Sequence, residues 1–402
     1  MDLRSLPPGL SPTDRCNERR SRIERELDID LSRTRFLDED LGAADEKNCE
    51  QMFGAVPIPV GYAGPLAVTF SSNEKHNIHL PLATTEGALV ASVNRGCKAV
   101  SASGGVKTSS EHRGISRSIA LRVESGPAAR LPARQGQAGK VDSVKTRSAE
   151  WIAIAERTSK HLKVMNFEID ERDDYVFLTV SADTDEAMGM NMITIAAQSV
   201  GEWIAETIGG CSFVTVAANV ESDKKPSLRT YERGRGYEVF AEATIPEEIL
   251  GSILKSSSVD LLEVARAKLE LGSEIAGAIG SNLHAANVIA ALYLATGQDA
   301  AHVVEGSLAD TSVSQVENGL KITVRLPAIL VGVRGGGTGL PAQNQCLSML
   351  LGCHGEPCRT IHPCRHVAES CGAAVLAGEL SLLAALASHS LAKAHEKLGR
   401  SC

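Results

Sequence analysis

The feature that most limits what this 402-residue chain can fold into is the small size of its apolar side chains. Hydrophobic residues make up 43% of the sequence, but aromatic residues make up only 3%, and there are 36 glycines. Small side chains allow helices to pack closely against one another, whereas larger residues commonly fill the core of a β-sandwich. The composition therefore favours tightly packed helices over an aromatic-filled sandwich.

Length and charge narrow the class of protein further. A chain of 402 residues is too long for one ordinary hydrophobic core, so two or three domains are expected. The net charge of −8 argues against a nucleic-acid-binding protein that works through an overall basic surface, although a local basic pocket would still suit a phosphorylated ligand.

Membrane and export signals are not expected in this sequence. Glycine, serine or charged residues interrupt every apolar run before the roughly 18 residues that a membrane span needs. The N-terminus lacks the apolar core of a signal peptide. We therefore expect a cytoplasmic protein whose 10 cysteines are reduced.

Helical and strand patterns alternate along the chain. Thr84 or Thr85 could cap a helix that runs to Val100, which places Glu86 in or near its first turn. Strand-like and helical runs alternate between residues 117 and 215, which suggests an inserted α+β domain. Helices are also expected at 14–53, 144–163, 189–208, 258–296 and 365–398, an extended, turn-rich segment at 55–70, and strands at 118–123, 175–182 and 237–245.

Several segments together resemble those of 3-hydroxy-3-methylglutaryl-coenzyme A (HMG-CoA) reductases, more closely the class found in eukaryotes and archaea (class I) than the bacterial class. Each segment alone is a weak signal, but they occur in the order of the family and span residues 48–402. The segments are VPIPVGYAGPL (56–66), LATTEGALVASVNRGCKAV (82–100), EAMGMNM (186–192), DKKP (223–226), AGAIGSNLHAAN (276–287), GQDAA (297–301), GGGT (335–338), AGELSLLAALA (377–387) and LAKAH (391–395).

This resemblance implies an α+β fold with three parts. A small N-terminal helical region would span residues 1–54, and an inserted ferredoxin-like NADP(H)-binding domain residues 116–216. A large, mainly helical HMG-CoA-binding domain around a long central helix would be formed by 55–115 and 217–402. The family's active site lies between subunits, so the resemblance implies a homodimer or homotetramer. Many eukaryotic members also carry an endoplasmic-reticulum anchor, which we do not expect here.

The family reduces HMG-CoA to mevalonate, a precursor of isoprenoids and sterols, by two hydride transfers from NADPH with loss of coenzyme A thiolate. Such chemistry needs a cation beside the carbonyl oxygen, a proton donor, and a donor to the departing sulfur. The resemblance implies that Lys224 stabilises the oxyanion and that His395 protonates the thiolate. It implies that Glu86 is the catalytic acid and that Asp299 is the carboxylate beside it.

Each of these four residues also has an ordinary structural interpretation. Lys224 could lie in a solvated turn, and Glu86 could be a first-turn glutamate that the helix dipole favours. Asp299 could be a helix cap, and His395 a surface histidine on a frayed tail. The ordered set of family segments favours the catalytic interpretation over these alternatives.

Substrate and cofactor contacts follow from the same matching. The residues implied to hold the hydroxymethylglutaryl group are Arg113, Asp223 and Lys225, and a guanidinium suits the free carboxylate of that group. The residues near coenzyme A or facing the site from the central region are Asn94, Arg95, Lys268, His284 and Asn287. The residues implied to bind NADPH are Ser159, Lys160, Glu186, Met188, Gly189, Met190, Asn191, Gly336, Gly337 and Arg400.

Within that cofactor set, Ser159, Lys160 and Arg400 match residues at the 2′-phosphate, so the resemblance implies NADPH and not NADH. Gly189 should let backbone amides approach the pyrophosphate, although its segment is not a Rossmann fingerprint. The chain also departs from the family pattern. Glu186 replaces an aspartate, Ala217 a serine, Glu221 a cysteine, Gln51 an asparagine and Lys160 an arginine, and the segments before Arg113 and His284 are shorter than usual.

Cysteines and histidines crowd the segment before the last helix. They are Cys353, Cys358, Cys364 and Cys371 with His354, His362 and His366. Their spacing fits no standard zinc pattern, so reduced cysteines are expected and no metal.

Two other functions remain open on the sequence. A non-catalytic homologue would bind the acyl-CoA, or pair with a reductase, without oxidising NADPH. A reductase of another acyl-CoA would differ in its thioester preference.

Overall fold

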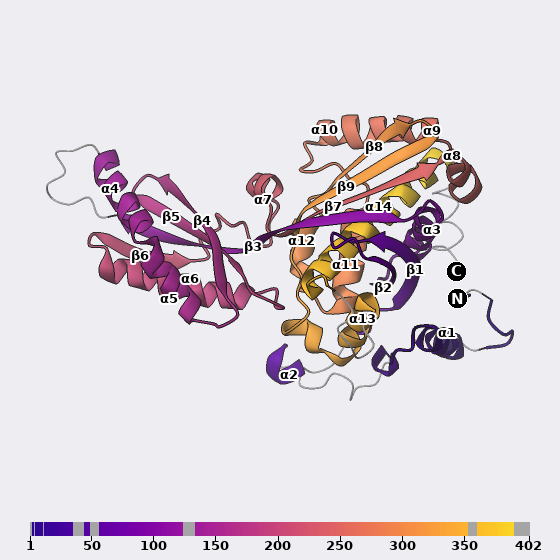
Figure 1. Cartoon of the computed structure of the whole chain (residues 1–402), viewed down its shortest axis with the longest axis horizontal. Helices are drawn as coiled ribbons and strands as arrows, with labels where there is room; N and C mark the ends of the chain where they lie inside the picture. The colour runs from indigo at the N-terminus through magenta and orange to yellow at the C-terminus, as the bar shows by residue number, and fades with distance from the viewer. Residues whose placement is uncertain are drawn as a thin grey trace.

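A computed structural model of the chain describes residues 2–3, 5–10, 12–34, 44–48, 56–123, 133–352 and 360–389. Within these residues helices are mixed with strands, and two main hydrophobic cores are present. We call the parts built on these two cores the large lobe and the small lobe. Figure 1 shows the small lobe, which carries α4, α5 and α6, on the left of the large lobe.

The long strand β3 (Val106–Val123) joins the two lobes (Figure 1). Its first half pairs with β7 in the sheet of the large lobe, and its second half pairs with β5 and β6 in the small lobe. The large-lobe strands follow the order β2-β1-β3-β7-β9-β8, and β4 pairs with β5. The other strands are β1 (Val60–Thr69), β2 (Lys75–Ala83), β4 (Lys163–Arg172), β5 (Tyr175–Asp183), β6 (Cys211–Val216), β7 (Gly236–Pro246), β8 (Asp310–Val316) and β9 (Gly319–Ile329). Residues near the middle of β3 therefore lie at the junction of the lobes.

The longest described helix, α14 (Pro363–Ala387), is buried in the large lobe. By length and composition it could cross a membrane, which the interrupted apolar runs of the sequence did not predict, but 83% of its apolar window is buried inside the protein. Its carboxylates Glu369 and Glu379 are also fully buried. Glu369 accepts hydrogen bonds from Thr108 and Ser110. Buried polar groups with partners in the same chain are typical of the core helix of a folded domain.

Small residues allow close packing of α3 (Leu89–Ala102) on α14, as the composition predicted. Gly96 of α3 faces the backbone of Ala377, and a Cβ atom at Gly96 would overlap the carbonyl oxygen of Ala377. Only glycine permits this separation of the two helices.

The remaining helices of the large lobe surround α14 and its sheet. They are α7 (Leu228–Arg233), α8 (Glu247–Ile249), α9 (Ser258–Ala265), α10 (Ser273–Ala276), α11 (Ala285–Thr296), α12 (Val303–Gly306) and α13 (Pro341–Leu351). Toward the N-terminus lie α1 (Pro12–Leu27) and α2 (Ala44–Lys47).

The small lobe packs its helices α4 (Ala133–Thr146), α5 (Ser148–Arg157) and α6 (Met190–Thr207) on the strands β3 to β6. The buried residues of α6 include Ile193, Ala197, Val200 and Ile204. This spacing of three, four and seven residues places them on one face of the helix. The face packs on β3 and β6, so α6 has a fixed position relative to the lobe junction.

Several elements expected from the sequence are confirmed. The strands at 118–123, 175–182 and 237–245 are parts of β3, β5 and β7, and the helix at 189–208 is α6.

The helix expected to start at Thr84 is wrong in its first turn. The Thr84 hydroxyl accepts a hydrogen bond from the Glu86 amide (3.0 Å) within a loop. The helix begins only at Leu89, after Ala88 with a φ of 74°. Glu86 therefore precedes the helix and is exposed to solvent.

Other expected helices are shorter than their patterns. The helix expected at 144–163 ends at Arg157, where the chain turns into β4. The segment 258–296 is interrupted at Gly277, which has a φ of 64°, and the last helix ends at Ala387. Residues 35–43, 49–55 and those from 390 onward lie outside the described part of the chain.

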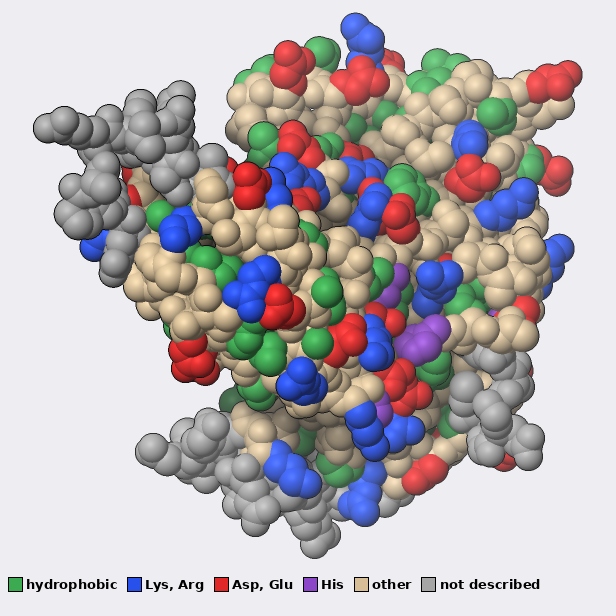
Figure 2. Space-filling model, turned by 60° about the vertical axis from the view of Figure 1, so that its left-hand side comes forward, with side chains coloured by type: hydrophobic (Ala, Val, Ile, Leu, Met, Phe, Trp, Pro, Cys, Tyr) green, Lys and Arg blue, Asp and Glu red, His purple; other side chains and the backbone are tan. Residues whose placement is uncertain are grey.

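Charged side chains of both signs are mixed on the face seen in Figure 2. Blue and red groups alternate there, without a broad area of one sign. This distribution agrees with the net charge in disfavouring a basic nucleic-acid-binding surface on that face.

Candidate active site

The loop of residues 217–226, between β6 and α7, carries the lysine at the centre of the candidate site. Four residues of this loop, none of them glycine, have a positive φ in the left-handed region: Ala217 (59°), Asn219 (65°), Ser222 (54°) and Lys224 (57°). This conformation is uncommon for such residues, and strained backbones of this kind cluster at functional sites. The buried Glu221 accepts hydrogen bonds from Ser118 of β3 and so fixes the loop to the lobe junction.

Lys224 forms an ion pair with Asp299, with 2.7 Å between Nζ and Oδ2. Asp299 follows the C-terminus of α11, which ends at Thr296, and its carboxylate also accepts a hydrogen bond from the Ala301 amide. Burial alone would raise the pKa of Asp299, but the hydrogen bonds from Lys224 and Ala301 outweigh it and lower that pKa. The side chains of Lys224 and Asp299 are 40% and 34% exposed, so a ligand can reach both.

Two arginines hold Asp223, the residue before Lys224. Arg235, at the turn into β7, lies 3.0 Å from Oδ1, and Arg117 of β3 lies 3.4 Å from Oδ2. Burial raises the pKa of Asp223, but the positive charge and hydrogen bond of Arg235, together with the charge of Arg117, lower it. Asp223 is therefore a carboxylate whose interactions fix the position of the Lys224 backbone.

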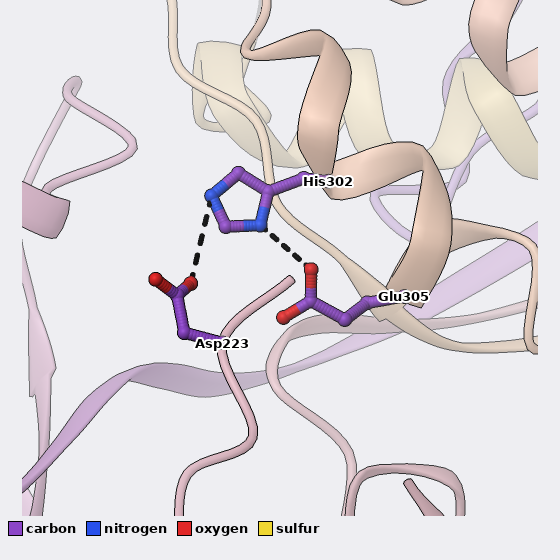
Figure 3. Close-up of side chains that lie close together, drawn as sticks. All are labelled: Asp223, His302 and Glu305. Carbon is purple, nitrogen blue, oxygen red and sulfur yellow. Dashed lines mark hydrogen bonds and ion pairs between the residues drawn. The ribbon is translucent and has the colours of Figure 1, made fainter. Parts of the chain in front are cut away.

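A histidine and a glutamate lie directly behind these residues. Figure 3 shows His302 with Nδ1 directed at Glu305 and Nε2 on the side of Asp223. The side chains of His302 and Glu305 are fully buried. Glu305 also forms an ion pair with Arg235.

The ligand atoms of Asp223, His302 and Glu305 lie within 4.8 Å of one another, a grouping that could suit a metal ion. Arg235, however, contacts both carboxylates of this group. A guanidinium in that position already neutralises the oxygens that a cation would need, so the group is better described as an ion-pair network.

The predicted substrate arginine, Arg113, is paired with two glutamates. The guanidinium of Arg113 pairs with Glu238 (2.6 Å) and Glu111 (2.7 Å), and within the described part of the chain no hydrogen bond or ion pair joins it to the 217–226 loop. Arg117, four residues later, contacts both Glu221 and Asp223. The structure thus brings Arg117, and not Arg113, to the lysine loop.

Three further predicted residues form no hydrogen bond or ion pair with the Lys224–Asp299 pair among the described residues: Glu86, Asn94 and Arg95. Among the described residues, no hydrogen bond or ion pair joins the Glu86 side chain to Lys224 or Asp299. Asn94 accepts a hydrogen bond from the Gly64 amide. Arg95 donates to the hydroxyl and the carbonyl oxygen of Ser381 on α14.

The other predicted substrate residues lie on the lysine loop, on an exposed helical turn and at the start of α11. Lys225 donates to the backbone oxygen of Asp223 (3.0 Å), whereas Lys268 is an exposed residue of a π-helical turn. His284 and Asn287 lie at the start of α11, and the His284 amide is held by Glu379 (2.8 Å). The Nε2 atom of His284 is buried, and no hydrogen-bond partner is found for it among the described residues.

The predicted cofactor segment lies beside the lysine loop. Gly189 has a φ of 91° and faces the Thr184 side chain, so another residue at that position would be strained and would clash. The sulfur of Met190 lies 3.1 Å from Nη2 of Arg235, the same arginine that holds Asp223. The Glu186 carbonyl oxygen accepts from the Val333 amide (2.8 Å).

The other predicted cofactor residues surround this segment. Ser159 contacts Met192 of α6 (3.4 Å), and Lys160 beside it is exposed. Gly337 packs directly on Gly297, two residues before Asp299. Met188 is half-buried, Asn191 and Gly336 are exposed, and Arg400 lies outside the described residues, as does His395.

Sequence reasoning missed Arg117, Arg235, His302 and Glu305. Two signals in the sequence could have indicated them. His302 and Glu305 follow Asp299 at a spacing of three residues, which places them on one face of a helical turn. Arg235 lies between two glycines, at a point where the backbone can bring a charged side chain into a crowded region.

Two cysteines of the last helix lie in the hydrophobic core of the large lobe. Cys364 and Cys371 are buried and free, and burial raises the pKa of each thiol to about 12. Cys353, Cys358 and His354 lie outside the described residues.

Comparison with solved structures identifies the overall fold. The class II 3-hydroxy-3-methylglutaryl-CoA reductase from Streptococcus pneumoniae bound to NADPH superposes with a TM-score of 0.67. The superposition covers 94% of this chain and 93% of that one, at 17% sequence identity. At this identity the likeness concerns the fold alone.

Sequence comparison then gives the family. The family described as hydroxymethylglutaryl-coenzyme A reductase matches residues 15–400. The 3-hydroxy-3-methylglutaryl-coenzyme A reductases of Methanocaldococcus jannaschii and Methanothermobacter thermautotrophicus are 40% and 38% identical, each over 95% of this chain and 92% of the relative. The reductase of Zea mays is 38% identical over 88% of this chain and 60% of the relative. The chain belongs to the hydroxymethylglutaryl-coenzyme A reductase family.

Proposed function

We propose that the protein reduces HMG-CoA to mevalonate and free coenzyme A with two molecules of NADPH. The observation that carries this proposal is the ammonium group of Lys224, held 2.7 Å from Asp299 in a site open to ligands. A fixed cation of this kind stabilises the negative oxygen that forms when a hydride reaches a thioester carbonyl.

The residues around α6 fit a phosphorylated dinucleotide. The first-turn amides of α6 have no acceptor within the helix, and Gly189, with a φ of 91°, permits the turn that precedes them. Lys160 supplies a positive charge in the turn next to that helix end, which suits a 2′-phosphate. NADPH bound there would supply the hydride for both reduction steps.

The chain's own residues would then act on the carbonyl group. Lys224 neutralises the oxyanion, and Asp299 holds the ammonium group in place through their ion pair. Glu86 would deliver a proton to the oxygen. His395 would protonate the departing thiolate.

Arg117 is our candidate for the carboxylate of the hydroxymethylglutaryl group. Its Nε donates to Thr194 and its Nη1 to Glu221 and Asp223, which leaves Nη2 for a substrate oxygen. Asp223 and Lys225 would hold the hydroxyl and carboxylate oxygens nearby. Asn94, Arg95, Lys268, His284 and Asn287 remain proposed contacts of the acyl-CoA.

We also propose the finer assignments of class and assembly. The 36–40% identity to archaeal reductases supports class I membership. The small lobe would be the ferredoxin-like cofactor domain of residues 116–216, inserted into a large domain of 55–115 and 217–402. Glu86 is exposed and, among the residues that the structure describes, forms no hydrogen bond or ion pair with Lys224, so a site shared between the subunits of a homodimer or homotetramer would bring them together.

A spectrophotometric assay with a panel of thioesters tests the proposed function. The purified chain should oxidise two NADPH molecules per HMG-CoA and release mevalonate. Faster turnover of another acyl-CoA would instead support a reductase of that thioester. Binding of HMG-CoA in calorimetry without any NADPH oxidation would refute the enzymatic assignment and support a binding protein.

A further inference from the structure

The buried ring of His302 has an unusual electrostatic environment. Its Nδ1 atom lies 2.7 Å from Glu305 Oε2, and its Nε2 atom faces Asp299 Oδ2 (3.7 Å) and Asp223 Oδ1 (3.9 Å). The side chain is fully buried, and Nε2 has no hydrogen-bond partner among the described residues. The ring thus lies between three carboxylates, behind the Lys224–Asp299 pair.

The tautomer of this ring follows from its contacts. A neutral ring that donates Nδ1–H to Glu305 would direct the lone pair of Nε2 toward two carboxylates, which is repulsive. A proton on Nε2 converts the same geometry into an attraction. This holds whether Glu305 is ionised and the ring is an imidazolium, or Glu305 is protonated and the ring is neutral.

The balance of charge in the network agrees with an added proton. Four carboxylates meet here, those of Glu221, Asp223, Asp299 and Glu305. They face three permanent cations, the side chains of Arg117, Arg235 and Lys224. One proton held by the His302–Glu305 pair brings the group to neutrality, which favours burial of charged groups.

We propose that His302 is a positioning residue that carries a proton on Nε2 and so keeps Asp299 ionised and turned toward the Lys224 ammonium group. Its effect on catalysis rests on the proposed function, because Lys224 must be the group that neutralises the oxyanion.

Nitrogen-detected histidine NMR spectra test the tautomer without any assay of activity. The His302 resonance is identified by its loss in His302→Gln. We expect Nε2 to be protonated at neutral pH. An unprotonated Nε2 at neutral pH would overturn the proposal, whatever the enzyme's activity.

Kinetics of two His302 variants test the positioning role. His302→Ala should lower kcat by about 10- to 100-fold, the range seen when outer partners of reactive groups are removed, with the KM for HMG-CoA nearly unchanged. His302→Gln, whose amide can donate from the position of Nε2, should recover most of that loss. Equal kcat values for His302→Ala and wild type would contradict the proposal.

His366→Gln is the matched control, because His366 is equally buried but stacks on Phe70 of the large-lobe core. It should change thermal stability without changing kcat. An equal fall in kcat for His366→Gln and both His302 variants would show a general packing effect and refute positioning. If the wild type oxidises no NADPH, the proposed function fails, and the NMR measurement still decides the state of His302.

Discussion

At the scale of single residues, the site depends on backbone conformations that cannot be predicted from the residue types. Lys224 has a φ of 57°, an unusual value for a lysine, and this turns its side chain toward Asp299. The sequence identified Lys224 and Asp299 through the family motifs, and their ion pair agrees with that matching. It did not indicate Arg117, because the family motifs match Arg113 and because the contacts of Arg117 with Glu221 and Asp223 join residues more than 100 positions apart.

The two arginines offer a paired test. Arg117→Lys should raise the KM for HMG-CoA, because lysine cannot keep both carboxylate contacts and bind the substrate with the same planar group. An increase of about tenfold corresponds to the loss of one charge-assisted hydrogen bond. Arg113→Lys, whose partners are Glu238 and Glu111, should leave the KM nearly unchanged. Steady-state kinetics measure both, and the reverse order of effects would restore Arg113 as the substrate residue.

The acidic residues of the site predict how stability depends on pH. The pKa values of Asp223 and Asp299 are both lowered from 3.8 in the folded protein. Protonation therefore favours the unfolded chain, so their contribution to stability is complete above pH 3.8 and is lost as the pH falls below it. Urea unfolding at neutral pH and at about pH 3 should show this loss, and Asp299→Asn should reduce it. An identical acid dependence in Asp299→Asn would contradict the role of Asp299.

At the scale of helices and strands, close packing of small residues determines the geometry of the large lobe. Gly96→Ala would place a methyl group against the Ala377 carbonyl oxygen and should lower the unfolding free energy by about 1–3 kcal/mol. Gly251→Ala is the matched control, since a Cβ at Gly251 meets nothing within 4 Å. Thermal denaturation should show a lower midpoint for the first variant only. Equal midpoints would mean that α3 and α14 can separate without loss of stability.

Helix and strand prediction succeeded where one face of an element is apolar and its ends carry a signal. Helix α6 has both, with Gly189 before it and regularly spaced apolar residues along it. The start of α3 was misplaced because Thr84 caps a local turn through the Glu86 amide, a competing use of the same side chain. The strands β8 and β9 were missed although they form a local hairpin joined by Glu317 and Asn318, whereas the pairing of β9 with β7 joins residues that are distant in sequence.

At the scale of the whole molecule, β3 brings the parts of the site together. Its residues Arg117 and Ser118 hold the lysine loop, while Asp299 and His302 come from the large lobe. The family motifs could predict that these segments converge, but the contacts between them depend on pairings across more than 100 residues. Local sequence patterns carry no information on such pairings.

Mixing two inactive variants tests whether the site is shared between subunits. Glu86→Gln and Lys224→Ala should each be nearly inactive alone. If Glu86 reaches the Lys224 of another subunit, co-refolded heterodimers contain one intact site, and about a quarter of the wild-type activity should return on random mixing. No recovery, with heterodimers shown by mass spectrometry, would mean that both residues act within one chain.

The measurement that tests our account most directly is the turnover of HMG-CoA by Lys224→Ala beside Lys321→Ala. Lys321 pairs with Glu242 at the same distance of 2.7 Å, and its side chain is 39% exposed against 40% for Lys224. We predict that Lys224→Ala lowers kcat by about 100- to 1,000-fold, the typical effect of removing an oxyanion donor, while Lys321→Ala retains wild-type turnover. Equal activity of the two variants would contradict the role of Lys224 as the group that neutralises the oxyanion.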